Sequence, residues 1–524
     1  MSAAGLSGSF HPFVGRDLPW LVDAQAAARP DKVFLVWEPF VGERRTWTFA
    51  EFARDTRAVG AGLWAQGVRK GDFVAIHMDN CPEFLLTWYA CSRVGATAVT
   101  TNTRSSGEEL AYFLSHSGAV AAVTQPRHLA VVRAAGPGLR WIACTETDAG
   151  EAPSAPSFEA APFEALVGDA SALPARPPEP LLPNSVQYTS GTTSRPKGVV
   201  WTHANALWSG RVNAAHARLT EADVNLFFFP LFHTNATAYS VLATLWSGGT
   251  AVMMPKFSAR RFWDVAARNR CTWANMVMFT IRALEDLPAP QDHAFRMWAY
   301  FGGGIRSVRE RWGVETIGWY GMTETVSQCV VCDPDFPLPE GTMGWPAPEY
   351  EVAIRREDGA EAALGETGRL WVRGVRGVSL FREYLNDPAA TADAFDHDGW
   401  FDTGDEVRAT ESGHLFFAGR AKDMLKVGAE NVAAIEIEAV INQVPGVVES
   451  AVVGRPDPML DEVPVAFVVA HAPGSALEAE IMARCHAALA DFKRPREILF
   501  RDALPKGLLD KTLKKDLRDE LRRG

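Results

Sequence analysis

A short segment near the middle of the chain collects hydroxyl groups, glycines and cations. Residues 188–198 read Tyr-Thr-Ser-Gly-Thr-Thr-Ser-Arg-Pro-Lys-Gly. Small polar residues and glycine can direct several N–H groups and hydroxyls at one point, and Arg195 and Lys197 add the positive charge that a polyphosphate requires. The P-loop pattern does not fit, because Lys197 precedes Gly198 where that pattern has Ser or Thr. The segment predicts a phosphate-binding loop, although taken alone it fits a hydroxyl-rich surface loop equally well.

Three later segments could complete a nucleotide site. The triple glycine at 302–304 follows a strand-like run, and it would let a flat ring lie against the backbone. Tyr320 could stack on a purine, Thr323 could bond a phosphate, and Glu324 could hold Mg²⁺. Asp405 ends the run Gly-Trp-Phe-Asp-Thr-Gly-Asp and suits a pair of ribose hydroxyls. Each segment by itself is more typical of a turn or a solvated face than of a binding site.

The end of the chain is basic. Eleven basic and six acidic residues lie between Lys493 and Arg523, and Lys511 is among them. Upstream, residues 419–432 combine Arg420, Lys422 and Lys426 with two glycines. Cations at these places could stabilise the charge that develops when a phosphate ester is attacked.

Alternating strands and helices are predicted to position these groups. A first run has helices at 48–67, 82–94 and 108–117 and strands at 73–76, 96–100 and 119–123. A second run has strands at 224–229, 251–254, 272–278 and 297–301. Such alternation favours an α/β fold with parallel sheets covered on both faces. Residues 148–183, rich in Ala, Pro, Glu and Ser, are predicted to form a solvent-exposed connection before the phosphate loop.

The pattern changes after Tyr350. Strands at 351–355, 368–373 and 415–418 predict a smaller, β-rich subdomain. Beyond Arg420, helices at 432–443 and 477–489 and strands at 449–453 and 463–469 precede a last amphipathic helix carrying Leu513, Leu517 and Leu521. We expect two layered α/β subdomains with a β-rich subdomain in a large N-terminal domain, and a small α+β C-terminal domain.

Composition narrows the class of ligand. The 524 residues carry a net charge of −11, which argues against a nucleic-acid binder and favours small ligands. The seven cysteines are scattered, and Cys329 and Cys332 in the one CxxC are predicted to be buried thiols. Neither a signal peptide nor a membrane-spanning stretch is predicted, so we expect a soluble cytoplasmic protein. A homodimer is compatible with the sequence.

The six motifs in this order resemble the adenylate-forming superfamily of acyl-CoA synthetases, non-ribosomal peptide adenylation domains and beetle luciferases. The resemblance extends from about Thr46 to Leu521. It implies an AMP-binding domain at 1–420 and a mobile C-terminal domain at 421–524, with a hinge near Lys422. It also implies a two-step reaction, in which a carboxylic acid and ATP give an acyl-adenylate and pyrophosphate, and a thiol then takes the acyl group and releases AMP. ATP, Mg²⁺ and coenzyme A are the implied cofactors.

The resemblance also assigns residues. The implied ATP and AMP contacts are Thr189, Ser190, Gly191, Thr192, Thr193, Lys197, Gly302, Gly303, Gly304, Tyr320, Gly321, Met322, Thr323, Asp405, Arg420 and Lys511. The implied catalytic residues are Lys511, Thr192, Glu324, His233 and Lys426, with Glu324 and Thr192 at the metal, and the implied coenzyme A side is Lys426, Gly428, Ala429 and Glu430. Two positions depart from the family pattern, where glycine is usual: Ser194 in the phosphate loop and Asp510 before the lysine that would bridge ATP and the acid.

The sequence limits the class of acid substrate but does not identify the acid. Relatives that activate amino acids carry Asp after the Pro-Leu-Phe run, whereas this chain has His233, which argues against an α-amino acid and favours coenzyme A ligases. The predicted acyl pocket consists of Phe232, His233, Asn275, Met276, Phe279, Gly303 and Met322. These side chains suggest a medium-sized fatty or aromatic acid, although several fit the hydrophobic core equally well. The motifs are similar to the crotonobetaine/carnitine-CoA ligase branch and to medium-chain acyl-CoA ligases.

Three alternatives stay open. The acyl group could pass to a carrier protein instead of free coenzyme A, although no carrier domain is predicted after the C-terminal domain. The chain could be an oxygenase of the luciferase type. It could also be a nucleotide-binding regulator with a disabled site, a hypothesis motivated by Asp510.

Overall fold

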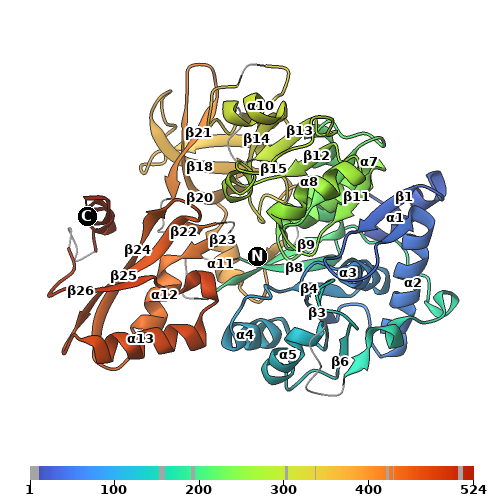
Figure 1. Ribbon diagram of the computed structural model, residues 1–524, viewed down its shortest axis with the longest axis horizontal. Coiled ribbons are helices and arrows are strands. Elements are labelled where there is room, and N and C mark those ends of the chain that lie inside the picture. The colour runs from blue at the N-terminus through green and yellow to red at the C-terminus, as the bar shows by residue number, and fades with distance from the viewer. Residues whose placement is uncertain are drawn as a thin grey trace.

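The computed structural model describes residues 11–152, 160–189, 195–300, 305–336, 338–428 without 421–423, 430–505 and 512–523; at 419, 420 and 431 it describes the backbone alone. Two large mixed sheets and a small one form an N-terminal unit (residues 11–420), and a further sheet forms a C-terminal unit (residues 424–523). Figure 1 shows the two units side by side. Among the described residues, no helix is long and apolar enough to cross a membrane.

The first sheet has the order β19-β9-β8-β4-β3-β5-β6-β7. Strands β3 to β8 are parallel, and β9 and β19 are antiparallel additions at one edge. The strands are β3 (Phe73–His77), β4 (Thr97–Thr100), β5 (Ala121–Thr124), β6 (Trp141–Cys144), β7 (Ala161–Pro162), β8 (Pro183–Thr189), β9 (Lys197–Thr202) and β19 (Glu383–Tyr384). Its helices are α2 (Phe49–Ala65), α3 (Pro82–Val94), α4 (Gly107–Ser117) and α5 (Leu129–Ala135). The parallel order confirms the first predicted α/β run.

The second sheet has the order β16-β15-β14-β13-β12-β10-β11-β1-β2, and its six central strands are parallel. The strands are β1 (Val33–Trp37), β2 (Arg45–Thr48), β10 (Val224–Phe227), β11 (Thr250–Met253), β12 (Trp273–Asn275), β13 (Met297–Tyr300), β14 (Glu315–Gly321), β15 (Gln328–Val331) and β16 (Trp345–Pro346). The helices are α1 (Leu18–Ala28), α6 (His203–His216), the π-helix Asn235–Leu242, α7 (Ala243–Ser247), α8 (Ala259–Arg268), α9 (Met278–Arg282) and α10 (Arg306–Trp312).

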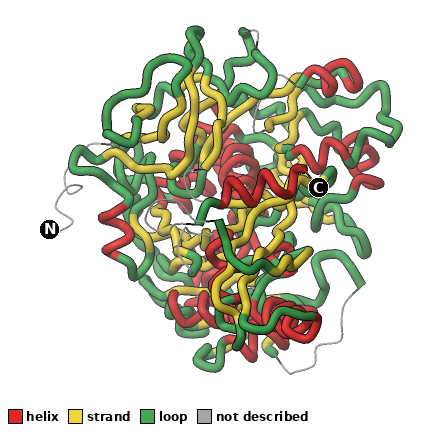
Figure 2. The backbone as a smooth tube through the Cα atoms, turned by 90° about the vertical axis from the view of Figure 1, so that its left-hand side faces the viewer, coloured by secondary structure: helices red, strands yellow, loops and turns green. Residues whose placement is uncertain are grey.

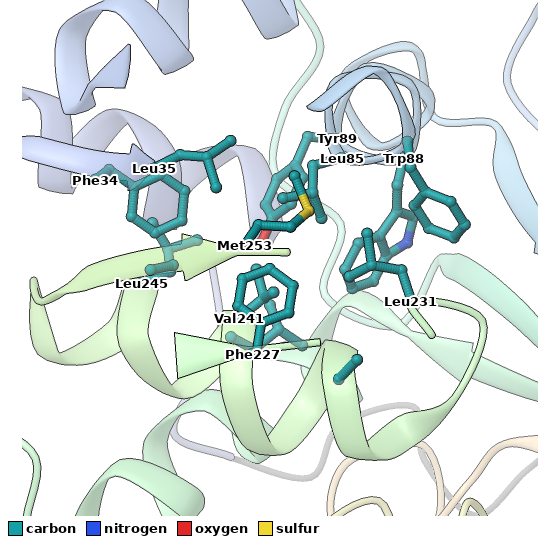
Figure 3. Close-up of a cluster of buried hydrophobic side chains, with 14 of the residues drawn as sticks. Phe34, Leu35, Leu85, Trp88, Tyr89, Phe227, Leu231, Val241, Leu245 and Met253 are labelled. Atoms are coloured by element: carbon teal, nitrogen blue, oxygen red, sulfur yellow. The ribbon is translucent and has the colours of Figure 1, made fainter. Parts of the chain in front are cut away.

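A shared hydrophobic core joins the two large sheets. Figure 3 shows Trp88 and Tyr89 of α3 facing Phe227 of β10 and Met253 of β11, with Leu231 beside them. These side chains are almost fully buried. Because α3 belongs to the first sheet and the strands to the second, the contact fixes the two layers relative to each other.

The remaining sheets are smaller. The β-rich part consists of β17 (Glu351–Arg355), β18 (Thr367–Arg373), β20 (Trp400–Ala409) and β21 (Leu415–Arg420), with α11 (Pro388–Asp393) nearby. The C-terminal unit contains β22 (Met424–Val427), β23 (Glu430–Ala433), α12 (Ala434–Ile441), β24 (Val447–Asp457), β25 (Asp461–Ala470), α13 (Ser475–Ala488), the short 3₁₀ helix Asp491–Lys493, β26 (Glu497–Phe500) and α14 (Lys514–Arg523). Figures 1 and 2 show α14 on the side of this unit that faces away from the N-terminal unit.

Three local predictions were wrong. The stretch 148–183 is not wholly exposed, because Phe163 and Leu166 are buried against α2. Gly62 of α2 allows this approach, since a Cβ there would lie 1.9 Å from the Leu166 carbonyl oxygen. The helix predicted from Val432 begins at Ala434, because the preceding residues form strand β23. The strand predicted at 272–278 ends at Asn275.

Candidate active site

The strands on either side of the predicted phosphate loop pair with each other in antiparallel fashion. Strands β8 and β9 pair so that Thr189 and Lys197 stand opposite each other, and Ser190 to Ser194, including Thr192, lie outside the described residues. The Lys197 ammonium lies 4.5 Å from the centre of the Tyr384 ring. Tyr384 reaches this place because β19 pairs with β9. A lysine at the base of the loop is thus held over an aromatic face.

The segment after β14 carries the predicted phosphate and metal contacts. The Trp201 indole N–H donates to the Thr323 carbonyl oxygen at 2.8 Å, and the Thr234 hydroxyl donates to the Thr323 hydroxyl at 3.0 Å. The Tyr384 hydroxyl donates to Glu324 Oε1 at 3.0 Å. Burial, together with the Glu324 charge, raises the pKa of Tyr384, so this hydroxyl stays a donor. Lys197, Thr323 and Glu324 are therefore brought together through Tyr384 and its neighbours.

The backbone of this segment is tightly constrained. A Cβ on Gly321 would lie 2.5 Å from the Tyr239 hydroxyl and 2.6 Å from the Ser327 carbonyl oxygen, so only glycine fits without movement. Val326 is fully buried at a φ of +65°, a region that β-branched residues rarely adopt. Strain of this kind often accompanies functional loops.

Tyr320, predicted to contact adenine, and Asp405, predicted to contact the ribose, are hydrogen-bonded to each other. The Tyr320 hydroxyl donates to Asp405 Oδ2 at 2.6 Å, and both side chains are buried. Asp405 on β20 stands opposite Arg420 on β21. The Met322 sulfur lies 3.9 Å from the Tyr320 hydroxyl. The triple glycine at 302–304 lies outside the described residues.

His233 follows β10 at the carboxyl edge of the second sheet. The backbone that leads from β10 to His233 is held by Asn80, a residue that was not predicted from the sequence. The Asn80 amide donates to the Phe229 carbonyl oxygen at 2.9 Å and accepts from the Leu231 N–H at 2.9 Å. Asn80 could have been found from the sequence, because it is a polar residue shortly after the predicted strand 73–76. Functional groups often lie where the strands of an α/β sheet end.

The other predicted pocket residues lie along the same edge or just behind it. Asn275 ends β12, and its amide donates to the Ser240 hydroxyl at 2.7 Å. Met276 is buried in the main core. The half-buried Phe279 contacts the ring of Phe257, with centroids 5.9 Å apart. The Phe232 ring packs beside the His233 imidazole, with centroids 4.4 Å apart.

A hairpin of the C-terminal unit reaches His233. Strands β22 and β23 pair Val427 with Glu430, and Gly428 at the turn has a φ of +62° that favours glycine. Glu430 Oε2 lies 3.0 Å from His233 Nε2. Burial would raise the pKa of Glu430, but the His233 charge and hydrogen bond outweigh it and lower the pKa. Lys426, on the same hairpin, donates its backbone N–H to Glu462.

Five of the described residues, Lys197, Thr323, Glu324, Tyr320 and Asp405, are among those predicted to contact the nucleotide or its metal ion. His233, predicted for the acyl pocket, contacts Glu430 of the second unit. Lys422, Ala429 and Lys511 lie outside the described residues.

Comparison with known proteins assigns the chain to a family. The model described as AMP-binding enzyme matches residues 22–385, and the model described as AMP-binding enzyme C-terminal domain matches residues 436–511. The chain belongs to the AMP-binding enzyme family. The two matches leave 386–435 between them, and the predicted boundary at 420/421 stays a prediction within that interval.

Several proteins similar to this AMP-binding enzyme are coenzyme A ligases by name. A crotonobetaine/carnitine–CoA ligase from Citrobacter koseri is 34% identical over 522 residues, covering 96% of this chain and 99% of its own. A solved o-succinylbenzoate CoA synthetase double mutant from Bacillus subtilis, bound with its product analogue OSB-NCoA, is 28% identical with a TM-score of 0.83, covering 95% of this chain and 98% of its own. The synthetase from the same organism in complex with AMP has a TM-score of 0.67 at the same identity and coverage. These likenesses confirm the predicted family and fold class.

Proposed function

We propose that this AMP-binding enzyme is an ATP-dependent acid–CoA ligase. A carboxylate oxygen of the acid attacks the α-phosphorus of ATP, the bond from that phosphorus to the bridging oxygen breaks, and pyrophosphate leaves. The sulfur of coenzyme A then attacks the acyl carbon, the carbon–oxygen bond to AMP breaks, and the thiol proton passes to solvent. The products are an acyl-CoA thioester, AMP and pyrophosphate.

The contact between His233 and Glu430 carries this proposal. Its two side chains come from different units, so the C-terminal hairpin closes over the acyl side of the site. The TM-score is higher for the synthetase double mutant bound with its product analogue OSB-NCoA (0.83) than for the synthetase in complex with AMP (0.67). Both observations support an arrangement suited to the second half-reaction, in which the thiol must reach the acyl carbon.

The nucleotide side supplies charge and position. Attack of a carboxylate on a phosphate brings like charges together, so catalysis depends on cations and donors placed beforehand. Lys197 and Thr323 are proposed to hold phosphates, and Asp405 to accept hydrogen bonds from ribose hydroxyls. Lys511 and the residues 190–194 are proposed to contact ATP on the grounds of the motifs alone.

Glu324 is proposed to hold Mg²⁺. Its buried carboxylate offers the oxygen donors that Mg²⁺ prefers. Within the described ranges, no cluster of three or more His, Cys, Asp or Glu side chains could form a complete metal cage. One carboxylate together with substrate phosphates is the usual arrangement for Mg²⁺, so the residues fit this ion. When bound, it would neutralise charge on the phosphates and on the leaving pyrophosphate.

The acid is proposed from the pocket and the relatives. Crotonobetaine and carnitine are the first acids to test because relatives that align over nearly the whole chain are named for them. Medium-chain and aromatic acids follow from the apolar Phe232, Phe279 and Met322. A cytoplasmic location and a homodimer stay predictions.

An acid panel tests the function. The full-length enzyme is incubated with Mg·ATP, coenzyme A and crotonobetaine, carnitine, butyrate, hexanoate, benzoate or o-succinylbenzoate, while pyrophosphate, AMP and thioester are measured. We expect at least one acid to give all three products in equal amounts. Glu324→Gln should remove pyrophosphate release, whereas Glu315→Gln, at the exposed start of β14, should not. If no acid stimulates pyrophosphate release, the proposal fails. An adenylate that forms but never passes to coenzyme A would favour another acceptor.

A further inference from the structure

The first turn of α4 contacts the C-terminal unit. Figure 1 places α4 next to α13. Ser106 caps α4, since its hydroxyl accepts from the Glu109 N–H at 3.2 Å, and Glu109 Oε2 accepts from the Ser106 N–H at 2.7 Å. This reciprocal arrangement satisfies backbone donors at the start of the helix. The Ser106 hydroxyl also donates to the carbonyl oxygen of Ala488, at the end of α13, at 2.7 Å. The cap itself is thus part of the contact between the units.

The second oxygen of Glu109 contacts a buried lysine of the other unit. Lys493 Nζ lies 2.5 Å from Glu109 Oε1 and 2.7 Å from Glu436 Oε1. Lys493, Glu109 and Glu436 are 6%, 8% and 5% exposed. Burial would lower the pKa of Lys493, but the two carboxylates outweigh it and raise the pKa, so this lysine stays charged. Glu436 lies on α12 and Glu109 on α4, so the lysine joins the two units.

This ion pair differs from the others along the same contact. Arg104 pairs with Asp491 at 2.6 Å and Arg484 with Glu108 at 2.8 Å, but these four side chains are between 32% and 58% exposed. Exposed pairs contribute little because water screens them. The buried group behaves differently. Loss of Lys493 would leave the carboxylates of Glu109 and Glu436 buried without a cation, and loss of the Glu109 charge would leave Lys493 paired only with Glu436 of its own unit, so either change removes the buried charge pair between the units. The Glu109–Lys493 pair should therefore decide whether the units stay together.

Glu436, which contacts the lysine, is close in sequence to the hairpin at the active site. Glu430 begins β23, and α12, which carries Glu436, follows that strand directly. Val432 and Ile437 pack in the same small core, so this hairpin and α12 move as one body. If α12 is held against α4 through Lys493, Glu430 is held against His233.

We propose that Glu109 and Lys493 are positioning residues for thioester formation, holding the C-terminal unit so that its hairpin meets the acyl side of the site. The proposal rests on the ligase function argued above. Neither residue touches substrate in this scheme. Both act on the second half-reaction by stabilising the arrangement in which it occurs.

Substitutions can separate the ion pair from the helix cap. Glu109→Gln removes the charge that faces Lys493 but keeps a side chain able to complete the cap, because Gln serves in this motif as Glu does. Lys493→Gln removes the charge from the other side. Glu108→Gln is the matched control, because it changes the neighbouring residue on the same turn, whose ion pair crosses the same contact but is exposed.

A first measurement needs no substrate. Dyes on Ala130→Cys of α5 and Glu480→Cys of α13, both exposed positions, report the distance between the units by energy transfer in the full chain. The native cysteines are all buried, so labelling can be selective. We expect Glu109→Gln and Lys493→Gln to lower the ratio of docked to undocked molecules by about tenfold or more and Glu108→Gln by less than about twofold. The double variant should do no worse than the more severe single one.

A second measurement compares the half-reactions, with the most active acid of the panel. Thioester formation from supplied acyl-adenylate should fall by about tenfold or more in Glu109→Gln, with pyrophosphate release changed by less than about threefold. The proposal is overturned if wild-type enzyme shows no docked population, if Glu109→Gln behaves like Glu108→Gln, or if both half-reactions fall equally. Failure of the ligase function itself would instead appear as wild-type enzyme that releases no pyrophosphate.

Discussion

Replacement of Tyr384 by Phe isolates one hydrogen bond at the candidate active site. The hydroxyl of Tyr384 donates to the buried carboxylate of Glu324 at 3.0 Å, whereas the ring of Tyr384 lies under the ammonium of Lys197. The substitution removes the donor and keeps the ring. Lys197 should therefore hold its place while Glu324 loses a fixed orientation.

The magnitude follows from the kind of bond that is lost. A hydrogen bond to a charged group contributes about 1.5–3 kcal/mol. If Glu324 must keep its orientation to hold Mg²⁺ in the transition state, pyrophosphate release should fall by about 10- to 150-fold. The thioester half-reaction from supplied acyl-adenylate does not involve the metal-bound phosphates and should change by less than about threefold.

The assay is acid-dependent pyrophosphate release, measured across a range of Mg²⁺ concentrations. Tyr89→Phe is the matched control, because the buried Tyr89 hydroxyl has no hydrogen-bond partner among the described residues and its removal should be nearly neutral. Pyrophosphate release by Tyr384→Phe within about twofold of wild type would refute the role assigned to this contact. An equal loss in Tyr89→Phe would refute the assignment as well, since it would point to general destabilisation.

Four further changes address other parts of the site. Glu430→Gln should slow thioester formation by about tenfold while adenylation is spared, because the contact with His233 loses its charge; equal effects on both half-reactions would contradict this. Lys511→Ala should abolish adenylation and spare thioester formation, and Lys426→Ala should do the reverse, as single-turnover assays of each step can check. Gly321→Ala should destabilise the fold by about 1–3 kcal/mol, because its methyl group would collide with the Tyr239 hydroxyl; an unchanged melting temperature would argue against the crowding described.

Local sequence signals predicted much of the fold. Helix α3 spans Pro82–Val94 as predicted. Proline at its first position and the left-handed Gly95 after its end are local signals that fix these bounds. Thr48 caps α2 with Glu51 three residues later. Strand β17 has the bounds predicted from the sequence. Each of these decisions depends on residues within one or two turns.

Features that depend on distant partners escaped prediction. Val432 was assigned to a helix, but its N–H and carbonyl lie in a strand that pairs with β22. Tyr384 and Asn80 reach the site through strand pairing and loop contacts between segments far apart in sequence, and neither belongs to a recognised motif. The contact of α4 with the C-terminal unit likewise depends on how the two units are placed relative to each other. The spacing of apolar residues in the sequence does not predict that placement.

The short stretch 381–385 makes backbone hydrogen bonds both to strand β9, which follows the predicted phosphate loop, and to the segment that carries Glu324. The N–H groups of Arg382 and Leu385 donate to the carbonyls of Val200 and Gly198 on β9, and the N–H of Phe381 donates to the carbonyl of Glu324. The proposed phosphate site and the proposed metal ligand Glu324 are thus mechanically linked through five consecutive residues. Amide protons on β9 and around Glu324 should therefore exchange with solvent in a single opening event.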